Sequence, residues 1–553
     1  MSSPGQEQAL KRHHERTRRR GVNTLVYWIT RAVLQPFFQI YFRMGRMGRQ
    51  HIPARGGVLL AANHRSFLDP FLIGCCLRRP IYFVAKQELF ENRLYGWFLN
   101  CLGAFPIRRG ESDTESMKTA RMLLERGDAV VIFPEGTRIR RGSLGKPKRG
   151  VGRLALEAGV PVVPIAVQGS ERARRGWIFR PVKVRVRCGP PITFPHVEKP
   201  SQHLASEVTA RIWPCVELQW EWLGGLPAMR KAAVVGAGSA GTAMATLLAR
   251  AGLEVQLCCR SAAQAEAIAA ARENAGYLPG VELPDSVVAT TIGDIEFAGV
   301  DLVVFAVPSS ALPAAVGSVG ARIGDRASVL ALSKGLVAPL GSLPTRYIAE
   351  RVNARAIAFV GGPAHAAESV ERGASIVLAS TDANLRDQLG DALARAGLDV
   401  ERSDDVTGVE LAGVAKNAAT LAAAAAAADG ANAAGAAAGH VFQEVHALAA
   451  ARGARTETFL GIAGAGDLVA TACAPHSRNR RAGELLGSGV PSEQITATVP
   501  QAAEGIEFVP LLVDVLSRAG IDAPATTALG ALIEGRIDSG AWLAEVRSQS
   551  RAA

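Results

Sequence analysis

The sequence of 553 residues lacks the features that mark a metalloprotein, a disulfide scaffold or a secreted protein. Its 8 cysteines form no CxxC pair and no Cys/His cluster with metal-ligand spacing, so we expect no metal site. Cys75-Cys76 and Cys258-Cys259 lie in apolar runs, which predicts reduced, buried thiols in a cytosolic protein. The N-terminus stays polar well past its basic run, so we expect no secretory signal peptide.

Acidic residues are scarce in the first part of the chain. Residues 1–230 hold 38 Lys+Arg and 17 Asp+Glu, a net charge of +21, whereas residues 231–553 hold 24 basic and 33 acidic residues, a net charge of −9. A basic half favours an anionic partner: nucleic acid, anionic lipid or a phosphorylated substrate. A solvated arginine-rich surface is the structural alternative.

The aromatic, apolar stretch that begins at Val22 is interrupted by Arg31, Gln35, Pro36 and Gln39. A membrane-spanning helix needs about 20 mostly apolar residues. The stretch therefore predicts an interfacial amphipathic helix with a break at Pro36, and a core-packed helix remains an equal alternative. Residues 1–21 are polar and basic, which predicts a disordered tail suited to nucleic acid or to an anionic membrane surface.

Buried strands alternate with helical segments through residues 56–167, which predicts an α/β domain. His64 follows the first of these strands and lies five residues before Asp69, a pairing in which the histidine can act as a general base. Such a pair also occurs by chance. The FPEGTR segment ends a second strand with Glu135 and Arg138, and Arg109 ends a third segment. Arginines at strand ends suit a phosphate group.

Four ordered motifs, NHRSFLDP, GAFPIRRG, FPEGTR and VPVVPI, resemble those of the glycerolipid acyltransferase family, whose type member is 1-acylglycerol-3-phosphate acyltransferase. The resemblance covers roughly residues 22–205. It implies that His64 deprotonates a glycerol hydroxyl for attack on an acyl thioester and that Asp69 orients the histidine. It implies no metal. It assigns the glycerol phosphate to residues of the arginine motif and the EGTR turn: Arg109, Glu135, Gly136, Thr137 and Arg138.

A second pattern begins at Lys231, where KAAVVGAGSAGTAMATLLARAG predicts a buried strand, a tight turn and a helix. Gly236, Gly238 and Gly241 form G-x-G-x-x-G, which permits the turn and the approach of a pyrophosphate to the helix N-terminus. The first strand of a dinucleotide-binding fold normally opens a domain, so the 230 residues before it predict a separate domain.

The second strand of this pattern, LEVQLCC, ends at Arg260. An arginine at this position accommodates a ribose 2′-phosphate, which favours NADPH and leaves NADH open. An exposed surface arginine is the alternative. After about Asp404 the sequence predicts only helices, rich in alanine, a strong helix former that permits close helix packing.

Seven ordered motifs, GAGSAGTA, LSKGL, GGPAHAAE, GVELAGVAKN, GIAGAGDL, SRNRR and AAEG, resemble NAD(P)-dependent glycerol-3-phosphate dehydrogenase over nearly all of 231–540. The resemblance implies that Lys416 protonates the carbonyl oxygen of dihydroxyacetone phosphate as hydride reaches C2, and that Asp467 pairs with this lysine. It assigns substrate binding to Lys334, Gly362, Ser477, Arg478 and Asn479. It assigns cofactor binding to Gly236, Gly238, Ser239, Ala240, Gly241, Arg260, Lys334, Ala366, Arg478 and Glu504.

The sequence departs from the dehydrogenase pattern at two places. Ala364 stands where the family usually has a serine after the Gly-Pro pair, and the segment after Ala-Asp-Gly is shortened, with Gly439-His440-Val441 in place of a Thr-Arg-Gly triplet. Both departures bear on activity, and neither removes the lysine, the aspartate or the arginine.

The chain is therefore expected to be an α/β fusion of two enzymes. We expect a disordered tail (1–21), an acyltransferase domain (22–205), a linker (206–230), a Rossmann domain with a doubly wound parallel sheet (231–404) and an all-α substrate and catalytic domain (405–553). The dehydrogenase would make glycerol 3-phosphate from dihydroxyacetone phosphate with NADPH or NADH. The acyltransferase would acylate it, or lysophosphatidate, from acyl-CoA or acyl carrier protein.

We expect a cytoplasmic protein bound peripherally to the cytoplasmic face of an anionic membrane, with a homodimer as a further possibility and nucleic acid not expected as a partner. Three alternatives remain. One is an acyltransferase with an inactive, regulatory dehydrogenase-like domain, and the second is a membrane-binding scaffold. The third is nucleic-acid binding by the basic tail, which predicts affinity that falls steeply with salt.

Overall fold

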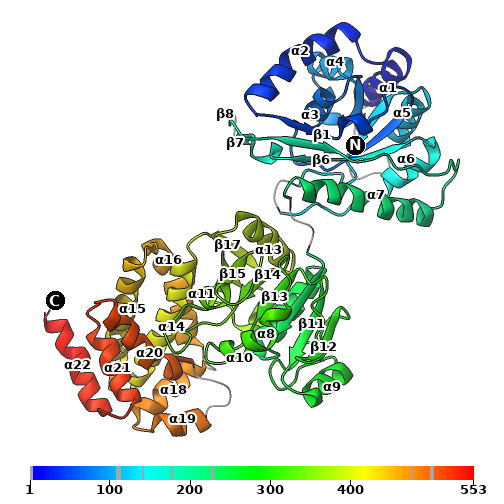
Figure 1. Ribbon diagram of the computed structural model, residues 1–553. Coiled ribbons are helices and arrows are strands. Elements are labelled where there is room, and N and C mark those ends of the chain that lie inside the picture. The colour runs from blue at the N-terminus through cyan, green and yellow to red at the C-terminus, as the bar shows by residue number, and fades with distance from the viewer. Residues whose placement is uncertain are drawn as a thin grey trace. The chain divides into compact units, whose positions relative to one another are not determined.

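The computed structural model describes residues 4–107, 114–139, 142–175, 178–225, 229–474, 477–498 and 504–552. The chain divides into two compact units, Met1–Ala228 and Met229–Ala553. Figure 1 shows an α/β unit first, then a second α/β sheet followed by helices alone. The predicted fold class, an α/β unit before a Rossmann sheet with an all-α C-terminal region, is confirmed.

The first unit is built on a seven-stranded sheet with the order β1-β9-β6-β2-β5-β3-β4. Strands β6, β2, β5, β3 and β4 run parallel, and β9 pairs antiparallel with β6. Every residue of β2 is buried, as expected for a strand covered on both faces. The strands are β1 (Gly45–Met47), β2 (Val58–Ala62), β3 (Ile81–Lys86), β4 (Ala104–Ile107), β5 (Ala129–Ile132), β6 (Val162–Gln168) and β9 (Arg185–Cys188), with β7 (Arg174–Arg175) and β8 (Ile178–Phe179) as a separate hairpin.

Helices cover both faces of this sheet. One face packs on α2 (Thr24–Ile40), α3 (Asp69–Cys76) and α4 (Arg93–Cys101), and the other on α5 (Thr114–Glu125), α6 (Gly150–Ala158) and α7 (Gln202–Trp222). Short 3-10 turns are η1 (Arg49–His51), η2 (Gln87–Phe90) and η3 (Ser170–Arg172). The prediction of a linker over 206–230 is wrong for α7, because Ile212, Trp213 and Val216 are buried in the core of the first unit.

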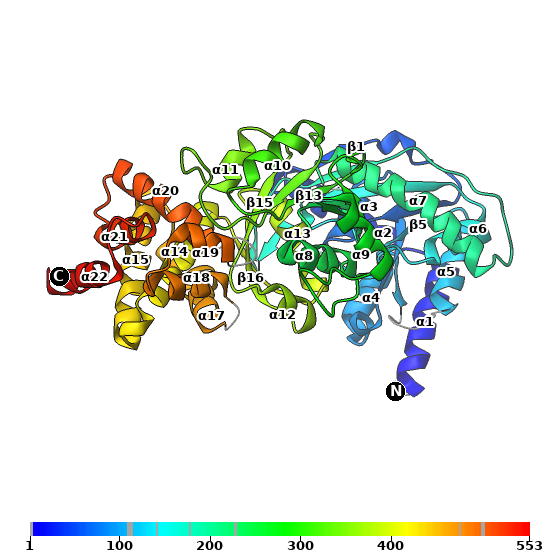
Figure 2. The same cartoon turned by 90° about the horizontal axis from the view of Figure 1, so that it is seen from below.

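The prediction of a disordered tail is wrong for residues 4–20, which form α1 (Pro4–Arg20). Figures 1 and 2 both place α1 beside α5, and the structure records contacts of α1 with α5 and β4. His14 and Thr17 are buried, and Asn100 Nδ2 donates to Thr17 Oγ1 at 2.7 Å. These tertiary contacts order a polar helix that its own composition does not stabilise.

The predicted break at Pro36 is also wrong, because α2 continues through this residue to Ile40. Tyr27 and Phe38 are buried against the unit, whereas Leu25, Ile29 and Val33 are 70%, 56% and 66% exposed at spacings of four residues. The helix therefore has one core face and one exposed apolar stripe. Among the described residues no single helix is both long and apolar enough to cross a bilayer, and one bent pair, 456–473 with 478–487, passes that test jointly.

The second unit contains an eight-stranded sheet with the order β12-β11-β10-β13-β14-β15-β16-β17. The first six of these strands are parallel, and β16 pairs antiparallel with β15. The strand order reverses between β10 and β13, which is where an open α/β sheet binds its ligand. The strands are β10 (Lys231–Val235), β11 (Glu254–Cys259), β12 (Val287–Thr291), β13 (Leu302–Phe305), β14 (Ser328–Ala331), β15 (Ile357–Gly361), β16 (Ser375–Ala379) and β17 (Asp399–Ser403).

The helices of the second unit form two groups: one lies between the strands of the sheet, and the other follows β17 and contains no strands among its described residues. The first group is α8 (Ser239–Arg250), α9 (Ala262–Ala271), α10 (Leu312–Val319), η4 (Gly320–Arg322), α11 (Pro344–Ala349), α12 (Ala366–Glu371) and α13 (Ala383–Arg395). The second is α14 (Val406–Ala425), η5 (Ala427–Asp429), α15 (Ala431–Ala451), α16 (Thr456–Leu460), the π-helix η6 (Ile462–Gly466), α17 (Asp467–Cys473), α18 (Arg478–Gly487), α19 (Ser492–Thr498), α20 (Glu504–Arg518), α21 (Pro524–Ile533) and α22 (Ser539–Ala552).

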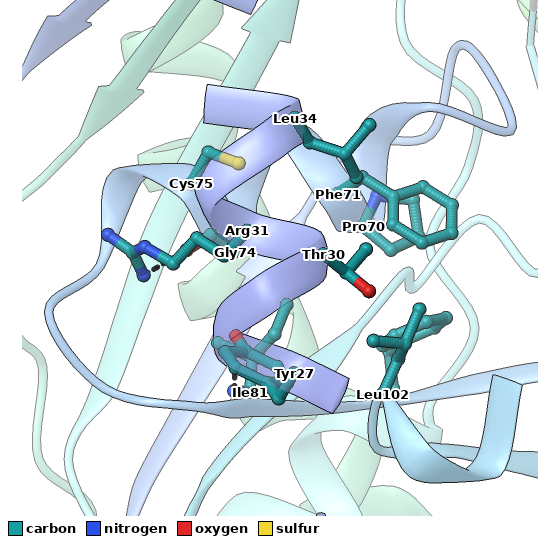
Figure 3. A pocket seen from close by; sticks show the side chains of 11 residues that line it. Tyr27, Thr30, Arg31, Leu34, Pro70, Phe71, Gly74, Cys75, Ile81 and Leu102 are labelled. Atoms are coloured by element: carbon teal, nitrogen blue, oxygen red, sulfur yellow. Dashed lines mark hydrogen bonds between the residues drawn. The ribbon is translucent and has the colours of Figure 1, made fainter. Parts of the chain in front are cut away.

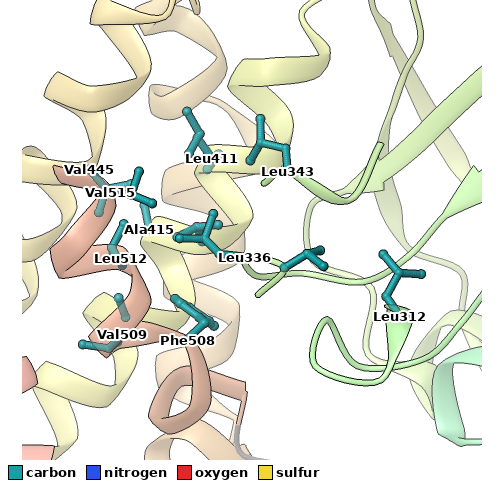
Figure 4. Close-up of a cluster of buried hydrophobic side chains, with 14 of the residues drawn as sticks. Leu312, Leu336, Leu343, Leu411, Ala415, Val445, Phe508, Val509, Leu512 and Val515 are labelled. Carbon is teal, nitrogen blue, oxygen red and sulfur yellow. The ribbon is translucent and has the colours of Figure 1, made fainter. Parts of the chain in front are cut away.

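Helix α14 is the centre of the helical region and carries Lys416. Figure 4 shows Leu411 and Ala415 of α14 packed with Phe508 and Leu512 of α20 and with side chains from the sheet region. On its other side α14 meets α18, where a Cβ on Gly483 would lie 2.4 Å from the carbonyl oxygen of Leu421. Small residues thus allow the backbones of α14 and α18 to approach closely. This approach places the first residues of α18 near Lys416 of α14.

Candidate active sites

His64 and Asp69 form a hydrogen-bonded pair at the carboxyl end of β2. His64 Nδ1 lies 3.0 Å from Asp69 Oδ2, and the imidazole stacks on Phe133 with ring centroids 4.1 Å apart. Asp69 is fully buried and His64 is 8% exposed. With Nδ1 held by the carboxylate, Nε2 is the nitrogen left to accept a proton from a substrate.

The carboxylate of Asp69 is fixed from three further directions. Its Oδ2 accepts hydrogen bonds from the backbone amides of Arg65 and Ser66 at 2.6 and 2.7 Å, and its Oδ1 accepts from the Ser170 hydroxyl at 2.6 Å. Ser170 follows β6, the neighbour of β2 in the sheet. Sequence reasoning missed this serine, because no motif marks it and 101 residues separate it from Asp69.

Glu135, which the resemblance assigns to substrate binding, supports the backbone of the site. Its Oε2 accepts from the His64 amide at 2.5 Å and its Oε1 from the Gly145 amide at 2.8 Å. Burial raises the pKa of this carboxyl to about 7, against the lowering effect of the two amides. Since both oxygens are engaged and the residue is 3% exposed, Glu135 holds β5 to the end of β2.

The other members of the expected phosphate group have different placements. Gly136 takes a positive φ of 69°, and a Cβ there would lie 3.0 Å from the Lys148 side chain, which sequence reasoning did not single out. Thr137 is exposed and Arg138 is half-buried in the turn after β5, next to β2. Arg109 lies outside the described residues. The structure thus brings Thr137 and Arg138 to the edge of the sheet that carries His64.

An apolar crevice lies between α2 and α3, and α3 begins at Asp69 of the catalytic pair. Figure 3 shows Leu34 and Phe71 on one side and Tyr27, Ile81 and Leu102 at the other, with Pro70 next to Phe71. Pro70 and Phe71 directly follow Asp69. The crevice therefore provides hydrocarbon-lined space beside α3, the helix that begins at Asp69.

The glycine pattern of the second unit is sterically required at two of its three positions. Gly236 has a φ of +114°, and a Cβ there would meet Ala306 O at 2.6 Å. A Cβ on Gly241 would lie 1.8 Å from Gly236 O, so only glycine permits this strand-to-helix contact. A Cβ on Gly238 would meet nothing within 4 Å, and this residue is the N-cap of α8. The open space at the helix N-terminus fits a pyrophosphate.

Four more of the residues assigned to the cofactor lie near the same edge of the sheet. Arg260 is exposed immediately after β11, the neighbour of β10, where a ribose would lie. Ser239 Oγ donates to the Tyr277 carbonyl at 2.7 Å, so its hydroxyl serves the fold. Ala240 and Ala366 line one apolar cavity between α8 and α12. These residues fit a nicotinamide dinucleotide laid across the strand ends.

Lys416 and Lys334 share the carboxylate of Asp467. Lys334 Nζ donates to Asp467 Oδ2 at 2.6 Å and to the Gly362 carbonyl at 3.0 Å. Lys416 Nζ lies 3.4 Å from Asp467 Oδ1 and donates to Thr471 Oγ1 at 3.1 Å. Gly362 therefore contributes through its carbonyl to lysine placement. The structure brings Lys334 and Gly362, which follow β14 and β15, together with Lys416 of α14 and Asp467 of α17, although Lys334 and Asp467 lie 133 positions apart in the chain.

These contacts shift the protonation of the cluster. Burial lowers the pKa of Lys416 to about 8, and Lys334 adds to that effect while Asp467 opposes it. Burial acts to raise the pKa of Asp467, but the two lysines outweigh it and hold the pKa below its usual value. Burial also raises the pKa of Glu504 to about 7. A lysine with a pKa near neutrality is suited to exchange a proton during turnover.

A cavity of about 210 Å³ opens on this cluster. Asn479 Nδ2 donates to Asn417 Oδ1 at 2.9 Å, Asn417 Nδ2 lies 3.4 Å from Glu504 Oε2, and the exposed Arg478 adds a cation at the rim. The lining is Lys334, His365, Lys416, Asn417, Thr471, Ser477, Arg478, Asn479 and Glu504. Three cations around a small polar cavity fit a phosphorylated substrate. His365, Asn417 and Thr471 were not singled out from the sequence.

The two departures from the dehydrogenase pattern lie outside this cavity lining. Ala364 is exposed beside His365, and it lines the apolar cavity between α8 and α12. Gly439, His440 and Val441 lie within α15, where Val441 is fully buried in the helical core. Neither place removes a contact of Lys416 or Asp467.

Comparison with known proteins identifies both units. The family described as acyltransferase matches residues 46–168. The family of NAD-dependent glycerol-3-phosphate dehydrogenase matches residues 231–386 with its N-terminal part and 405–544 with its C-terminal part. Glycerol-3-phosphate dehydrogenase [NAD(P)+] of Streptomyces griseus is 38% identical over 312 residues, which are 55% of this chain and 93% of that protein. The protein of the same name from Bradyrhizobium is 37% identical over 310 residues, which are 55% of this chain and 92% of that protein.

A solved structure supports the same family for the second unit. Crystalline glycerol-3-phosphate dehydrogenase from Coxiella burnetii matches with a TM-score of 0.55 at 28% identity, over 58% of this chain and 99% of that one. The residues that match the dehydrogenase family, 231–386 and 405–544, include the glycine turn, the two lysines, the aspartate that they share and the lining of the polar cavity. Residues 231–544 belong to the NAD-dependent glycerol-3-phosphate dehydrogenase family, and an acyltransferase domain precedes them, so that the chain is a bifunctional dehydrogenase and acyltransferase.

Proposed function

We propose that the first unit transfers an acyl group from a thioester to the free hydroxyl of 1-acylglycerol 3-phosphate, giving phosphatidate. Glycerol 3-phosphate is the alternative acceptor. The observation that carries the proposal is the His64–Asp69 pair, whose Nδ1–Oδ2 distance of 3.0 Å leaves Nε2 for the acceptor hydroxyl. The apolar crevice beside Phe71 supports a substrate that carries a hydrocarbon chain.

The proposed acyl transfer uses few protein groups. His64 Nε2 takes the hydroxyl proton as the oxygen attacks the thioester carbonyl, the carbon–sulfur bond breaks, and the proton passes to the departing thiolate. Asp69 stabilises the positive imidazolium, and Ser170 with the Arg65 and Ser66 amides keeps the carboxylate in place. Arg138 supports phosphate binding from the turn after β5.

A nicotinamide cofactor, when bound in the second unit, would supply a hydride for the C2 carbonyl of dihydroxyacetone phosphate. Lys416 donates a proton to the carbonyl oxygen, so a ketone, a hydride and a proton give the secondary alcohol of glycerol 3-phosphate. Asp467 orients both lysines, and Arg478 with Ser477 and Asn479 supports the substrate phosphate at the rim of the cavity. Arg260 after β11 supports a preference for NADPH over NADH.

The surface of the first unit supports the proposal of a membrane location. Helix α4 contacts α2 and adds two exposed apolar side chains to the exposed stripe of α2. These are Leu94, which is 75% exposed, and Trp97, which is 41% exposed. Together with the net charge of +21 of residues 1–230, they support peripheral binding to an anionic membrane from the cytoplasm. The proposed acyl donor is acyl-CoA or acyl carrier protein. The proposed oligomeric state is a homodimer.

The test measures both reactions on one purified protein. NADPH oxidation is followed with dihydroxyacetone phosphate, and radiolabelled acyl-CoA transfer is followed separately to glycerol 3-phosphate and to lysophosphatidate. His64→Ala should lose only acyl transfer, and Lys416→Ala should lose only NADPH oxidation. Transfer to glycerol 3-phosphate alone would refute the proposed acceptor, and loss of both activities in either variant would refute two independent sites.

Vesicle flotation tests the membrane proposal. Replacement of Leu25, Ile29 and Val33 by serine should abolish flotation with phosphatidate-containing vesicles, because these side chains form the exposed stripe of α2. Leu460→Ser, at a leucine 71% exposed in the second unit, serves as the control. Unchanged flotation of the triple variant would contradict the proposed contact.

A further inference from the structure

A basic cavity lies at the edge of the first sheet opposite the catalytic pair. It has a volume of about 370 Å³ and is lined by residues 49–50, 52–54 and 76–79, with Arg49, Arg78 and Arg79 in its wall. The first segment precedes β2 and the second precedes β3, so both lie at the amino ends of these parallel strands. His64 follows the carboxyl end of β2, which makes the two sites separate.

The local sequence offers almost no acid to balance these cations. Residues 41–87 contain eight Lys+Arg and a single acid, Asp69, which is fully buried and engaged with His64. In the described part of the chain, none of Arg49, Arg78 and Arg79 has an ion-pair partner, and the cavity lining contains no Asp or Glu. Like charges gathered around a concave surface create a strong positive potential.

Two of the nearby arginines have structural roles. Arg79 Nη1 donates to the Gly56 carbonyl at 2.7 Å and its Nη2 donates to the Gly127 carbonyl, and burial lowers the pKa of this guanidinium against the raising effect of Asp128. Asp128 itself pairs with Arg126 at 2.6 Å. Arg46 Nη1 donates to Cys75 O at 3.3 Å, near the C-terminal end of α3. Within the described ranges of the first unit, Arg49 and Arg78 have no hydrogen bond or ion pair of this kind.

We propose that this cavity is a second phosphate-binding site, separate from the acyl-transfer site. Arg49 and Arg78 bind the phosphate oxygens, and Arg79, fixed by backbone carbonyls, adds its charge from the cavity wall. The phosphate belongs either to a membrane phospholipid headgroup or to a free phosphorylated metabolite. Arg49 begins the turn that follows α2 by nine residues, which links the site along the chain to the helix with the exposed apolar stripe.

The test uses the full chain and two charge-matched double variants. Arg49→Ala/Arg78→Ala removes two cavity cations, and Lys199→Ala/Arg211→Ala removes two exposed cations elsewhere in the first unit. One arm titrates inorganic phosphate by calorimetry, and the other measures binding to phosphatidylcholine vesicles with and without phosphatidate. An arginine at an anionic surface contributes roughly fivefold in affinity, so the cavity variant, which lacks two, should bind about 25-fold more weakly. Thermal unfolding checks that each variant is folded.

Each outcome decides the proposal. Weaker binding of the cavity variant to phosphatidate vesicles alone supports a headgroup site, and weaker binding to inorganic phosphate as well supports a free phosphate ligand. Arg49→Lys/Arg78→Lys keeps the charge and loses the planar donor geometry, so it should bind with intermediate affinity. Equal losses in the cavity and control variants, or no loss in either, would overturn the proposal.

Discussion

Removal of the carboxylate at Asp467 should shift the pH dependence of ketone reduction. Lys416 must be protonated to donate its proton, so kcat/KM for dihydroxyacetone phosphate should fall as the pH rises through the pKa of about 8 of this lysine. Asp467 raises that pKa by attraction, and Lys334 lowers it by repulsion. Asp467→Asn keeps the shape of the side chain, removes the attraction and leaves the repulsion in place.

The size of the shift follows from the geometry. Unit charges 3.4 Å apart interact with about 5 kcal/mol at an effective dielectric constant of about 20, which corresponds to more than three pKa units. Glu504, whose pKa burial raises to about 7, offsets part of this loss as it ionises. We therefore expect the pKa of Lys416 to fall by at least about one unit, to about 7 or below.

The assay is the initial rate of NADPH oxidation across a pH series, in both the wild type and Asp467→Asn. The alkaline limb of kcat/KM for reduction should move to lower pH, and oxidation of glycerol 3-phosphate should persist to lower pH, because it needs the neutral lysine. Asp399→Asn, at an exposed aspartate after α13, is the matched control. An alkaline limb that stays near pH 8, or moves upward, would show that Lys416 is not the proton donor.

Four further substitutions test the two sites. His64→Ala should lower acyl transfer by about 10²- to 10⁴-fold while NADPH oxidation stays at the wild-type rate, as measured in parallel assays; a comparable loss in both would contradict the assignment. Glu135→Ala leaves two buried amides without acceptors, so denaturant unfolding of the first unit should lose at least about 2 kcal/mol and acyl transfer should fall with it. Gly241→Ala places a Cβ 1.8 Å from Gly236 O and should lower both the melting temperature and cofactor affinity, whereas Gly238→Ala, which has open space, should keep the melting temperature and weaken only cofactor binding. Equal melting temperatures for the two glycine variants would refute this distinction.

The sequence was sufficient where function depends on the ends of parallel strands. Buried apolar runs followed by His64, by FPEGTR and by the glycine turn predict strands whose carboxyl ends carry polar groups. In a parallel sheet these ends meet at one edge, so the order of motifs along the chain implies their proximity in space. Glycine at 236 and 241 is likewise readable, because no other residue permits the close contacts that the structure records there.

The sequence was insufficient where a side chain has two plausible partners. Glu135 stands in a motif that suggests a ligand contact, and only the folded chain shows both its oxygens on backbone amides. Ser170 belongs to no motif, yet its hydroxyl fixes Asp69. Such contacts join residues about 70 to 100 positions apart, and their geometry depends on how neighbouring strands are aligned in the sheet.

Local composition alone determined that the chain holds two α/β units, because buried strands, glycine turns and helix formers are local signals that each unit repeats. Tertiary structure decided the state of segments whose composition is ambiguous. Residues 4–20 are too polar to form a stable helix in isolation, and they are helical because His14 hydrogen-bonds to α5 and Thr17 to α4. The long helix α7 belongs to the first unit for the same reason, since burial of Trp213 and Val216 stabilises a segment that the sequence leaves between domain and linker.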